Sequence, residues 1–165
     1  IINYEKPIIS LVNGIAFGGG LEINLLFDIV IASEDATFSV PEGLIGAIPP
    51  IASSLGQAII GRKITRYCLT GEHMDAEEAK QLGIVDVVVP KDQLEITGVE
   101  YVNKITRLAP LSIRAIKEIS KTYKNMYKQI LEKGLHELAE LASTEDFAEG
   151  MRSFLHRKHP SWTGK

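Results

Sequence analysis

Hydrophobic residues fall into two patterns along the chain, and the change between them divides the sequence. Over the first 90 residues they form short continuous runs that are rich in β-branched residues and bounded by Pro, Gly or Asn. Such runs are typical of short strands that are buried in a sheet. The expected strands are residues 8–12, 28–32, 37–40 and 85–89.

Short helices are expected between these strands, at residues 20–27, 51–60, 63–69 and 75–83. The spacing of Asp75 and Glu78 is that of a capping box, and Gly83 provides the end of the same helix. Residues 43–50 contain two glycines and two prolines, which favours a loop.

From residue 93 onward the hydrophobic positions recur with the period of an amphipathic helix. The expected helices are residues 93–108, 111–125, 127–142 and 144–156, and Pro110 fits a helix N-terminus. We therefore expect an α/β protein with a strand-and-helix core in residues 1–90 and a helical region in residues 91–165.

Composition narrows the classes of protein that need to be considered. The 165 residues are 45% hydrophobic and 24% charged, which is ordinary for a globular domain. A net charge of −3 gives no general electrostatic reason to expect nucleic acid as a partner, and no apolar stretch approaches the length of a membrane span. The lone Cys68 excludes an internal disulfide framework and fits a reducing compartment, so we expect a cytoplasmic protein.

The candidate chemistry begins between the first two strands. Gly18, Gly19 and Gly20 precede a helix, where they allow a tight turn or a close approach by another group. The first amides of that helix have no intrahelical partner, so they can bind a negatively charged oxygen. Glu22 lies in the first helical turn, and Glu42 follows twenty residues later.

Each of these features also has a purely structural explanation. Three glycines can serve close strand–helix packing without any ligand. Glu22 can simply satisfy the helix N-terminus, and Glu42 after Pro41 can be a solvated turn residue. His73, His136, His156 and His159 show no metal-ligand spacing, so we expect no metal site.

The ordered combination resembles the signature of the enoyl-CoA hydratase/isomerase (crotonase) superfamily. Residues 13–22 read NGIAFGGGLE and residues 38–42 read FSVPE, as in the two catalytic segments of that superfamily. Further similarities are LTGE at 69–72 and EGMRSF at 149–154. The resemblance covers nearly the whole chain but begins partway into the usual length of the family. The chain also begins at Ile1 and reaches a buried strand within seven residues. We therefore expect an excerpt or a shortened version of a longer chain, without the N-terminal part.

The resemblance implies a spiral of ββα units, with a helical C-terminal region that assembles a homotrimer or a dimer of trimers. It also implies an acyl-CoA thioester as ligand and no cofactor, because coenzyme A is part of the substrate. The amide of Gly19 would be one of two oxyanion donors, and its partner would lie in the N-terminal part. Substrate-binding residues implied in the same way are Ala16, Phe17, Gly18, Pro41, Leu44, Arg157 and Lys158.

By the same resemblance, Glu22 and Glu42 favour a hydratase that adds water syn across the 2,3 double bond. Two carboxylates that share a site push their pKa values apart, which lets one accept and the other donate a proton. We expect Glu22 to deprotonate the water and Glu42 to protonate Cα, although the two roles could be mixed. An isomerase of the same fold and a shortened, non-catalytic chain for CoA binding or assembly remain the alternatives. Pro50 and the branched residues after it replace the glycine-rich loop of short-chain hydratases, so the resemblance does not determine which acyl group is bound.

Overall fold

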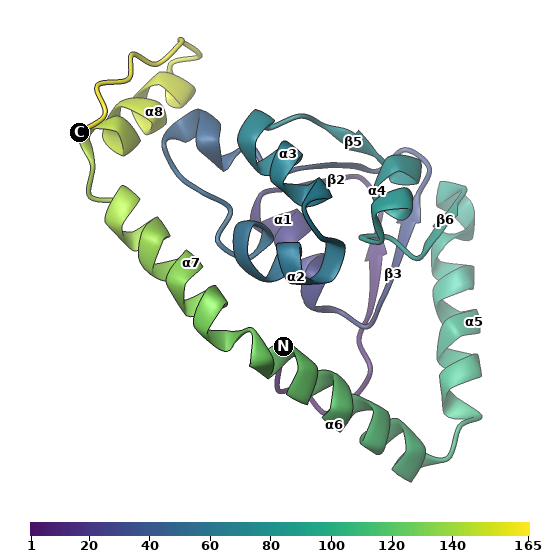
Figure 1. Cartoon of the computed structure of the whole chain (residues 1–165). Helices are drawn as coiled ribbons and strands as arrows, with labels where there is room; N and C mark the ends of the chain where they lie inside the picture. Colours follow the sequence, from purple (N-terminus) through teal and green to yellow (C-terminus); the bar gives the residue numbers. More distant parts are fainter.

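The computed structural model describes all 165 residues and contains two small sheets that share one core (Figure 1). The first sheet has the order β1-β3-β6 and is parallel throughout. The second has the order β2-β4-β5, in which β5 runs antiparallel to β4. The strands are β1 (Ile9–Val12), β2 (Ile15–Phe17), β3 (Ile29–Ser33), β4 (Thr37–Ser39), β5 (Met74–Asp75) and β6 (Val87–Val89).

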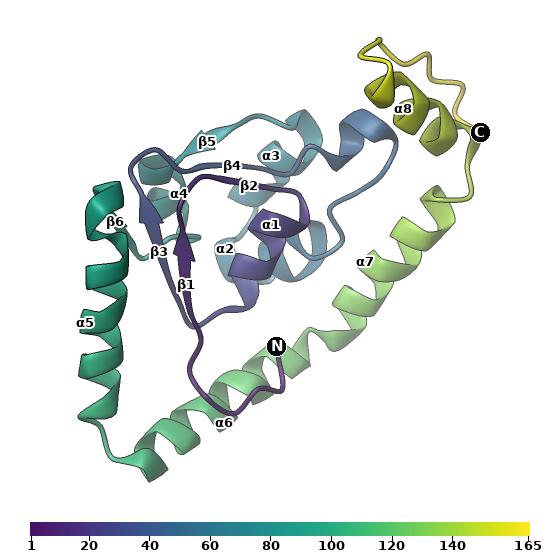
Figure 2. The ribbon, with the colours of Figure 1, turned by 180° about the vertical axis from the view of Figure 1, so that it is seen from behind.

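The first four strands alternate between the two sheets, which gives the fold its spiral form, and β5 then joins β4 in the second sheet before β6 returns to the first (Figure 2). β1 passes into β2 through Asn13 and Gly14, and the chain then turns into a helix. β3 and β4 repeat this step one turn further on, with Val12 beside Ala32 in one sheet and Ala16 beside Phe38 in the other. The structure thus confirms the expected α/β fold of ββα units.

Short helices fill the space against the sheets. The expected helix at 20–27 is present as α1 (Gly19–Glu22) followed by the 3-10 helix η1 (Ile23–Leu26). The others are η2 (Glu42–Ile45), the π-helical turn η3 (Ala52–Gly56), α2 (Gln57–Ile60), α3 (Lys63–Thr70), α4 (Ala76–Leu82) and the short 3-10 turn η4 (Lys91–Gln93). Asp75 caps α4 by accepting a hydrogen bond from the Glu78 amide (2.7 Å), as its spacing predicts.

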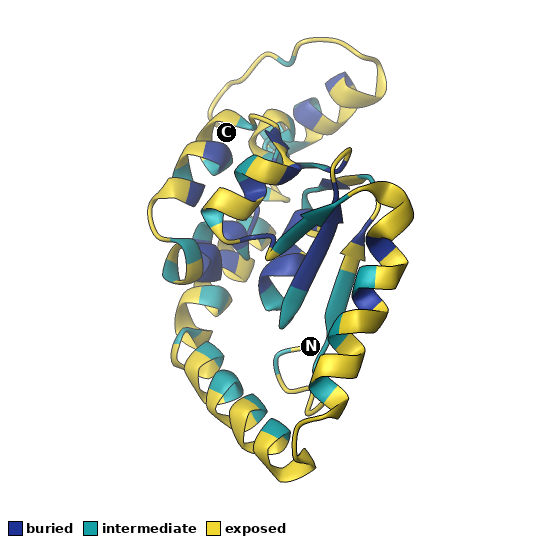
Figure 3. Cartoon of the chain, turned by 90° about the vertical axis from the view of Figure 1, so that its right-hand side faces the viewer, coloured by how far each residue is buried: buried dark blue, intermediate teal, exposed yellow.

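The core is formed by side chains from both sheets and from α1, α3 and α4. Phe38, Leu21, Ile64 and Met74 are almost completely inaccessible to solvent. Because α1 and the end of β4 both pack into this core, the residues that follow them are held in fixed positions. Figure 3 shows the central strands as the most buried part of the molecule.

The second half of the chain is helical, as its periodicity predicts. Its helices are α5 (Leu94–Thr106), α6 (Pro110–Met126), α7 (Lys128–Leu141) and α8 (Glu145–Leu155). α5 packs against β1 and β3, whereas α6 and α7 form a long arm along one side of the core (Figure 1). α7 contacts η3, and α8 contacts η2. None of the helices combines the length and apolarity that a membrane span requires.

The structure differs from the predicted elements at four places. Ile15–Phe17 and Met74–Asp75 are strands, although their two or three residues show no readable alternation. Residues 43–50 are not all loop, because η2 extends through Ile45. The helix expected at 51–60 begins as a π-helical turn and becomes α-helical only at Gln57.

Candidate active site

The site begins at the sharp turn between β2 and α1. Gly18 has φ +55°, a conformation that a residue with a side chain rarely adopts, and its N–H donates to Ser39 O (2.8 Å). A Cβ on Gly18 would lie 2.6 Å from Glu42 Oε1. The glycine therefore allows both the turn and the close approach of the Glu42 carboxylate.

Glu22 is held by a segment that lies about thirty residues away in the sequence. Its side chain is buried, with 4% of the residue exposed. Oε1 accepts hydrogen bonds from the N–H groups of Ile51 (2.7 Å) and Ala52 (2.8 Å), at the start of η3. These are the unpaired amides of a helix beginning, and they favour a negatively charged acceptor.

Glu42 is held in a different way. It is the first residue of η2, which follows β4 directly, and its side chain is half-buried. Oε2 is completely buried and has no hydrogen-bond partner. A buried carboxylate oxygen without a partner is costly, so its presence suggests a group that binds another molecule.

The two carboxylates affect each other electrostatically. Burial raises the pKa of Glu22, and the amides of Ala52 and Ile51 partly offset this effect. Burial also raises the pKa of Glu42; its own amide partly offsets this effect, and the negative charge of Glu22 adds to the rise. The structure thus brings together the two glutamates singled out from the sequence, in an environment that disfavours ionisation of both at once.

Cys68, which the sequence did not point to, faces the same carboxylates. Burial raises the pKa of its thiol to about 11, and the charges of Glu22 and Glu42 contribute in the same direction. The thiol therefore stays neutral and belongs to the wall of the site rather than to its charged groups. It comes from α3, which packs against both η2 and η3.

The remaining predicted residues near the turn surround this pair. Gly19 is the first residue of α1, so its N–H has no carbonyl acceptor within that helix. Ala16 is buried in β2, and the Phe17 ring packs against His73 with centroids 4.7 Å apart. Pro41 precedes η2, and Leu44 is 61% exposed on its outer side.

Comparison with known proteins identifies the family. A family model described as enoyl-CoA hydratase/isomerase matches residues 1–165. The chain belongs to this family. Carnitinyl-CoA dehydratases from Citrobacter koseri and Escherichia coli K12 are each 34% identical to it, over 172 and 176 residues, and the matches include all of this chain. The chain spans 66% of the length of these relatives.

Solved structures of the family superpose closely on the chain. A carnitinyl-CoA hydratase from Mycobacterium avium gives a TM-score of 0.88 at 32% identity, covering 98% of this chain and 64% of that one. A methylmalonyl-CoA decarboxylase gives 0.82 at 27% identity, covering 100% and 66%. Proteins with different named reactions therefore share this crotonase fold.

Two residues that the family resemblance implicates lie away from the glutamates. Arg157 and Lys158 follow the C-terminal end of α8 and are exposed, and no hydrogen bond or ion pair links their side chains to the site. Arg157 has φ +52°, where the chain turns into the C-terminal tail. Within this chain they are not part of the carboxylate site.

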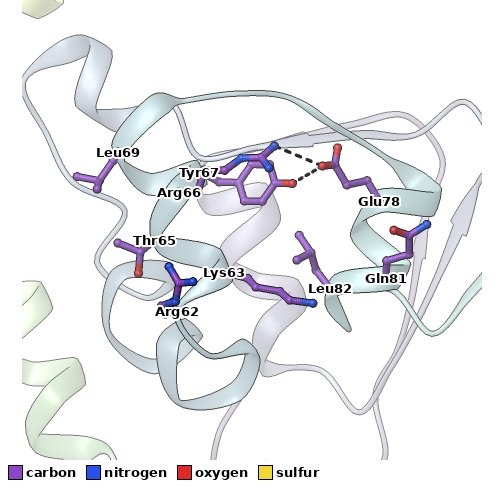
Figure 4. Close-up of a pocket in the computed structure, with 9 residues that line it drawn as sticks. All are labelled: Arg62, Lys63, Thr65, Arg66, Tyr67, Leu69, Glu78, Gln81 and Leu82. Carbon is purple, nitrogen blue, oxygen red and sulfur yellow. Dashed lines mark hydrogen bonds and ion pairs between the residues drawn. The ribbon is translucent and has the colours of Figure 1, made fainter.

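A separate hollow of about 570 Å³ lies between α3 and α4 (Figure 4). Arg66 and Tyr67 both reach Glu78 across it, and Arg62 and Lys63 line its other end. Neither glutamate of the candidate site lines this hollow. No group of three or more His, Cys, Asp or Glu side chains in the chain is arranged to hold a metal ion.

Proposed function

We propose that this chain carries the carboxylate pair of a hydratase that adds water to a 2-enoyl-CoA thioester. The observation that supports this most strongly is the pair itself: a buried and a half-buried glutamate, the charge of the first raising the pKa of the second, beside the glycine turn of the crotonase family. The names of the relatives, which are CoA hydratases and dehydratases, support the same reaction class, because dehydration is the reverse of hydration.

The proposed reaction uses the two glutamates in different protonation states. Glu22 takes a proton from water, and the water oxygen bonds to Cβ of the enoyl group. The electron pair of the double bond passes toward the thioester carbonyl, and the Glu42 carboxyl delivers a proton to Cα. Return of one proton from Glu22 to Glu42 restores the starting state, so no cofactor beyond the coenzyme A of the substrate is required.

The assignment of roles follows from the contacts of each side chain. The Ile51 and Ala52 amides stabilise an ionised Glu22, which suits a base. On Glu42 only its own amide acts in that direction, whereas burial and the charge of Glu22 disfavour the ionised form, which suits an acid. Transfer from the same side of the substrate would give syn addition.

The thioester oxygen is proposed to lie against the amide of Gly19. Two such donors stabilise the developing enolate, and losing one costs roughly a hundredfold or more in rate. The second donor and much of the CoA-binding surface would come from the part of the relatives that this chain does not span, or from a neighbouring subunit. Arg157 and Lys158 would then contact CoA phosphates only in an assembled homotrimer or dimer of trimers.

Carnitinyl-CoA is a second candidate for the acyl group, since it appears in the names of several relatives. Its cationic acyl end would be attracted by the ionised Glu22. Comparing hydration of crotonyl-CoA with dehydration of carnitinyl-CoA, each as kcat/KM, decides between the two.

The test follows the conjugated enoyl thioester spectrophotometrically with crotonyl-CoA and the purified protein. Glu22→Gln and Glu42→Gln should each lower kcat by roughly a hundredfold or more. Glu34→Gln, the same change at an exposed position, should leave it unaltered. Conversion of a 3-enoyl-CoA without hydration would indicate an isomerase instead, and CoA binding without turnover would indicate an assembly chain.

A further inference from the structure

Two glycines in the C-terminal helices are placed where a side chain would collide with a loop of the active site. Gly134 in α7 and Gly150 in α8 are buried, although most of the residues around them are exposed. Glycine is less favourable than alanine inside a helix. Their positions therefore call for a packing explanation.

Gly150 lies against the backbone of η2. A Cβ at this position would be 2.5 Å from both the carbonyl carbon and the oxygen of Ile45, and 2.8 Å from its Cα. Ile45 ends the short helix that begins with Glu42. Because the neighbouring atoms are backbone, even one methyl group would force α8 and η2 apart.

Gly134 lies in the same way against the segment that holds Glu22. A Cβ here would be 2.5 Å from Pro50 O and 3.2 Å from Ser54 Oγ. Pro50 immediately precedes Ile51 and Ala52, whose N–H groups bind Glu22.

We propose that Gly134 and Gly150 are positioning residues, which let α7 and α8 press against two loops and so set where Glu22 and Glu42 lie. The inference rests on the proposed function, in which these glutamates are the catalytic pair. Glu42 depends on such support because Oε2 has no hydrogen-bond partner and the only amide that acts on its carboxyl is its own, so the carboxylate follows the backbone of η2. Glu22 depends on it indirectly, through the amides at residues 51 and 52.

α8 is itself well fixed at its beginning, as a supporting element must be. Thr144 accepts a hydrogen bond from the Phe147 amide (3.1 Å) and caps the helix. Asp146 accepts bonds from the amides of Thr163 (2.7 Å) and Gly164 (2.9 Å) in the C-terminal tail. The tail and the cap thus fix the end of α8 that lies beside Gly46 of the η2 loop.

The inference is tested by NMR on the folded protein, so that the result does not require turnover. Glutamate labelled with ¹³C at the carboxyl reports the titration of Glu42, which faces Glu22 and the neutral thiol of Cys68. Gly150→Ala should lower the pKa of Glu42 toward its ordinary value, because the carboxyl becomes more exposed and moves away from Glu22. Gly134→Ala should instead shift the amide signals of Ile51 and Ala52.

Gly98→Ala is the matched control, since Gly98 is also buried within a helix but faces the flexible Leu11 side chain at 3.0 Å. This variant should leave both the Glu42 titration and the amide signals of Ile51 and Ala52 unchanged. If Gly150→Ala does not fold, Thr144→Ala removes the α8 cap without adding bulk and should move the pKa of Glu42 in the same direction. An unchanged Glu42 titration in the folded variant, or equal changes in the control, overturns the inference.

Turnover supplies the second readout. With crotonyl-CoA, the alanine variants at 134 and 150 should lose roughly tenfold or more in kcat with KM changed by less than about twofold, because misplacement affects the chemical step. An inactive parent protein would contradict the proposed function alone, because the NMR titrations report the positioning without turnover. Equal loss in kcat and stability for all three glycine variants would contradict the positioning role.

Discussion

At the scale of single residues, Glu42 and Gly18 form one structural unit. The carboxylate occupies the space where any other residue at position 18 would place its Cβ, and the positive φ of Gly18 forms the turn beside it. Neither residue can change without affecting the other. The unit also brings an unpartnered oxygen into a buried position, which reduces stability.

Glu42→Gln should therefore stabilise the protein at high pH. A carboxyl whose pKa is raised by folding favours the folded state below its ordinary pKa of 4.5, and this contribution is lost as pH rises through the raised value. We expect the variant to gain about 1 kcal/mol in free energy of unfolding at pH 8 and little at pH 4, measured by urea denaturation. Glu34→Gln is the exposed control, and a Glu42→Gln protein less stable than the parent at pH 8 would refute the account.

Gly18→Ala should damage both stability and activity. The added Cβ meets the Glu42 carboxylate, and the alanine backbone must adopt φ +55°. Together these two effects should cost about 1–3 kcal/mol in free energy of unfolding. Hydratase activity should fall by at least about tenfold, since a catalytic group is displaced. Gly14→Ala, where nothing lies within 4 Å of the new Cβ, should be close to neutral in thermal melting and turnover. Equal effects at the two positions would argue against the contact.

At the scale of secondary-structure elements, a largely buried ion pair joins α6 to the sheet. Asp28 Oδ2, just before β3, accepts hydrogen bonds from Lys117 Nζ (2.6 Å) and from the Ile8 amide (2.8 Å). The two charged side chains are only 12% and 18% exposed, for Lys117 and Asp28 respectively. A buried charge that loses its partner is strongly destabilising, whereas a surface pair contributes little.

Lys117→Met should accordingly lower the free energy of unfolding by about 1–3 kcal/mol, because the largely buried Asp28 loses the cation to which it is hydrogen-bonded. Lys133→Met removes a pair of similar length that is exposed, at 2.8 Å from Glu137, and should cost less than about 0.5 kcal/mol. Chemical denaturation of both variants measures the difference. Equal losses would show that burial does not distinguish the two pairs.

The secondary-structure elements differ in how well the sequence predicts them. The strands near residues 9–12 and 29–33 and the four C-terminal helices were predictable, because each has its own hydrophobic pattern. Ile15–Phe17 was not, since three residues after a turn are too few to show alternation. The glycines and glutamates could be chosen from their spacing, whereas the anchoring of Glu22 by residues 51 and 52 could not, because it joins distant segments. The position of Cys68 near the two glutamates could not be predicted either, because no sequence motif includes it.

At the scale of the whole molecule, α6 carries large apolar side chains that this chain leaves uncovered. Leu111, Ile119 and Met126 are 78%, 72% and 73% exposed. Exposed apolar surface of this kind is typical of an interface. It supports the proposal that the protein forms a homotrimer or a dimer of trimers.

Sedimentation equilibrium tests the proposed assembly. The parent protein should sediment as a trimer or hexamer, and Ile119→Glu should shift it toward the monomer by placing a charge on the apolar face. Lys133→Glu, a charge change on the exposed face of α7, should leave the assembly intact. A parent protein that is monomeric at every concentration would refute the proposed assembly.

The central claim is that Glu22 and Glu42 together hydrate an enoyl-CoA, and NMR in deuterated water tests it most directly. Crotonyl-CoA should yield 3-hydroxybutyryl-CoA with one deuteron at Cα, on the face that syn addition requires, and Glu22→Gln should abolish this product. Such a result would also show that another segment or subunit supplies the second oxyanion donor. No deuterated product at any protein concentration would contradict the claim and leave this chain a role in binding or assembly alone.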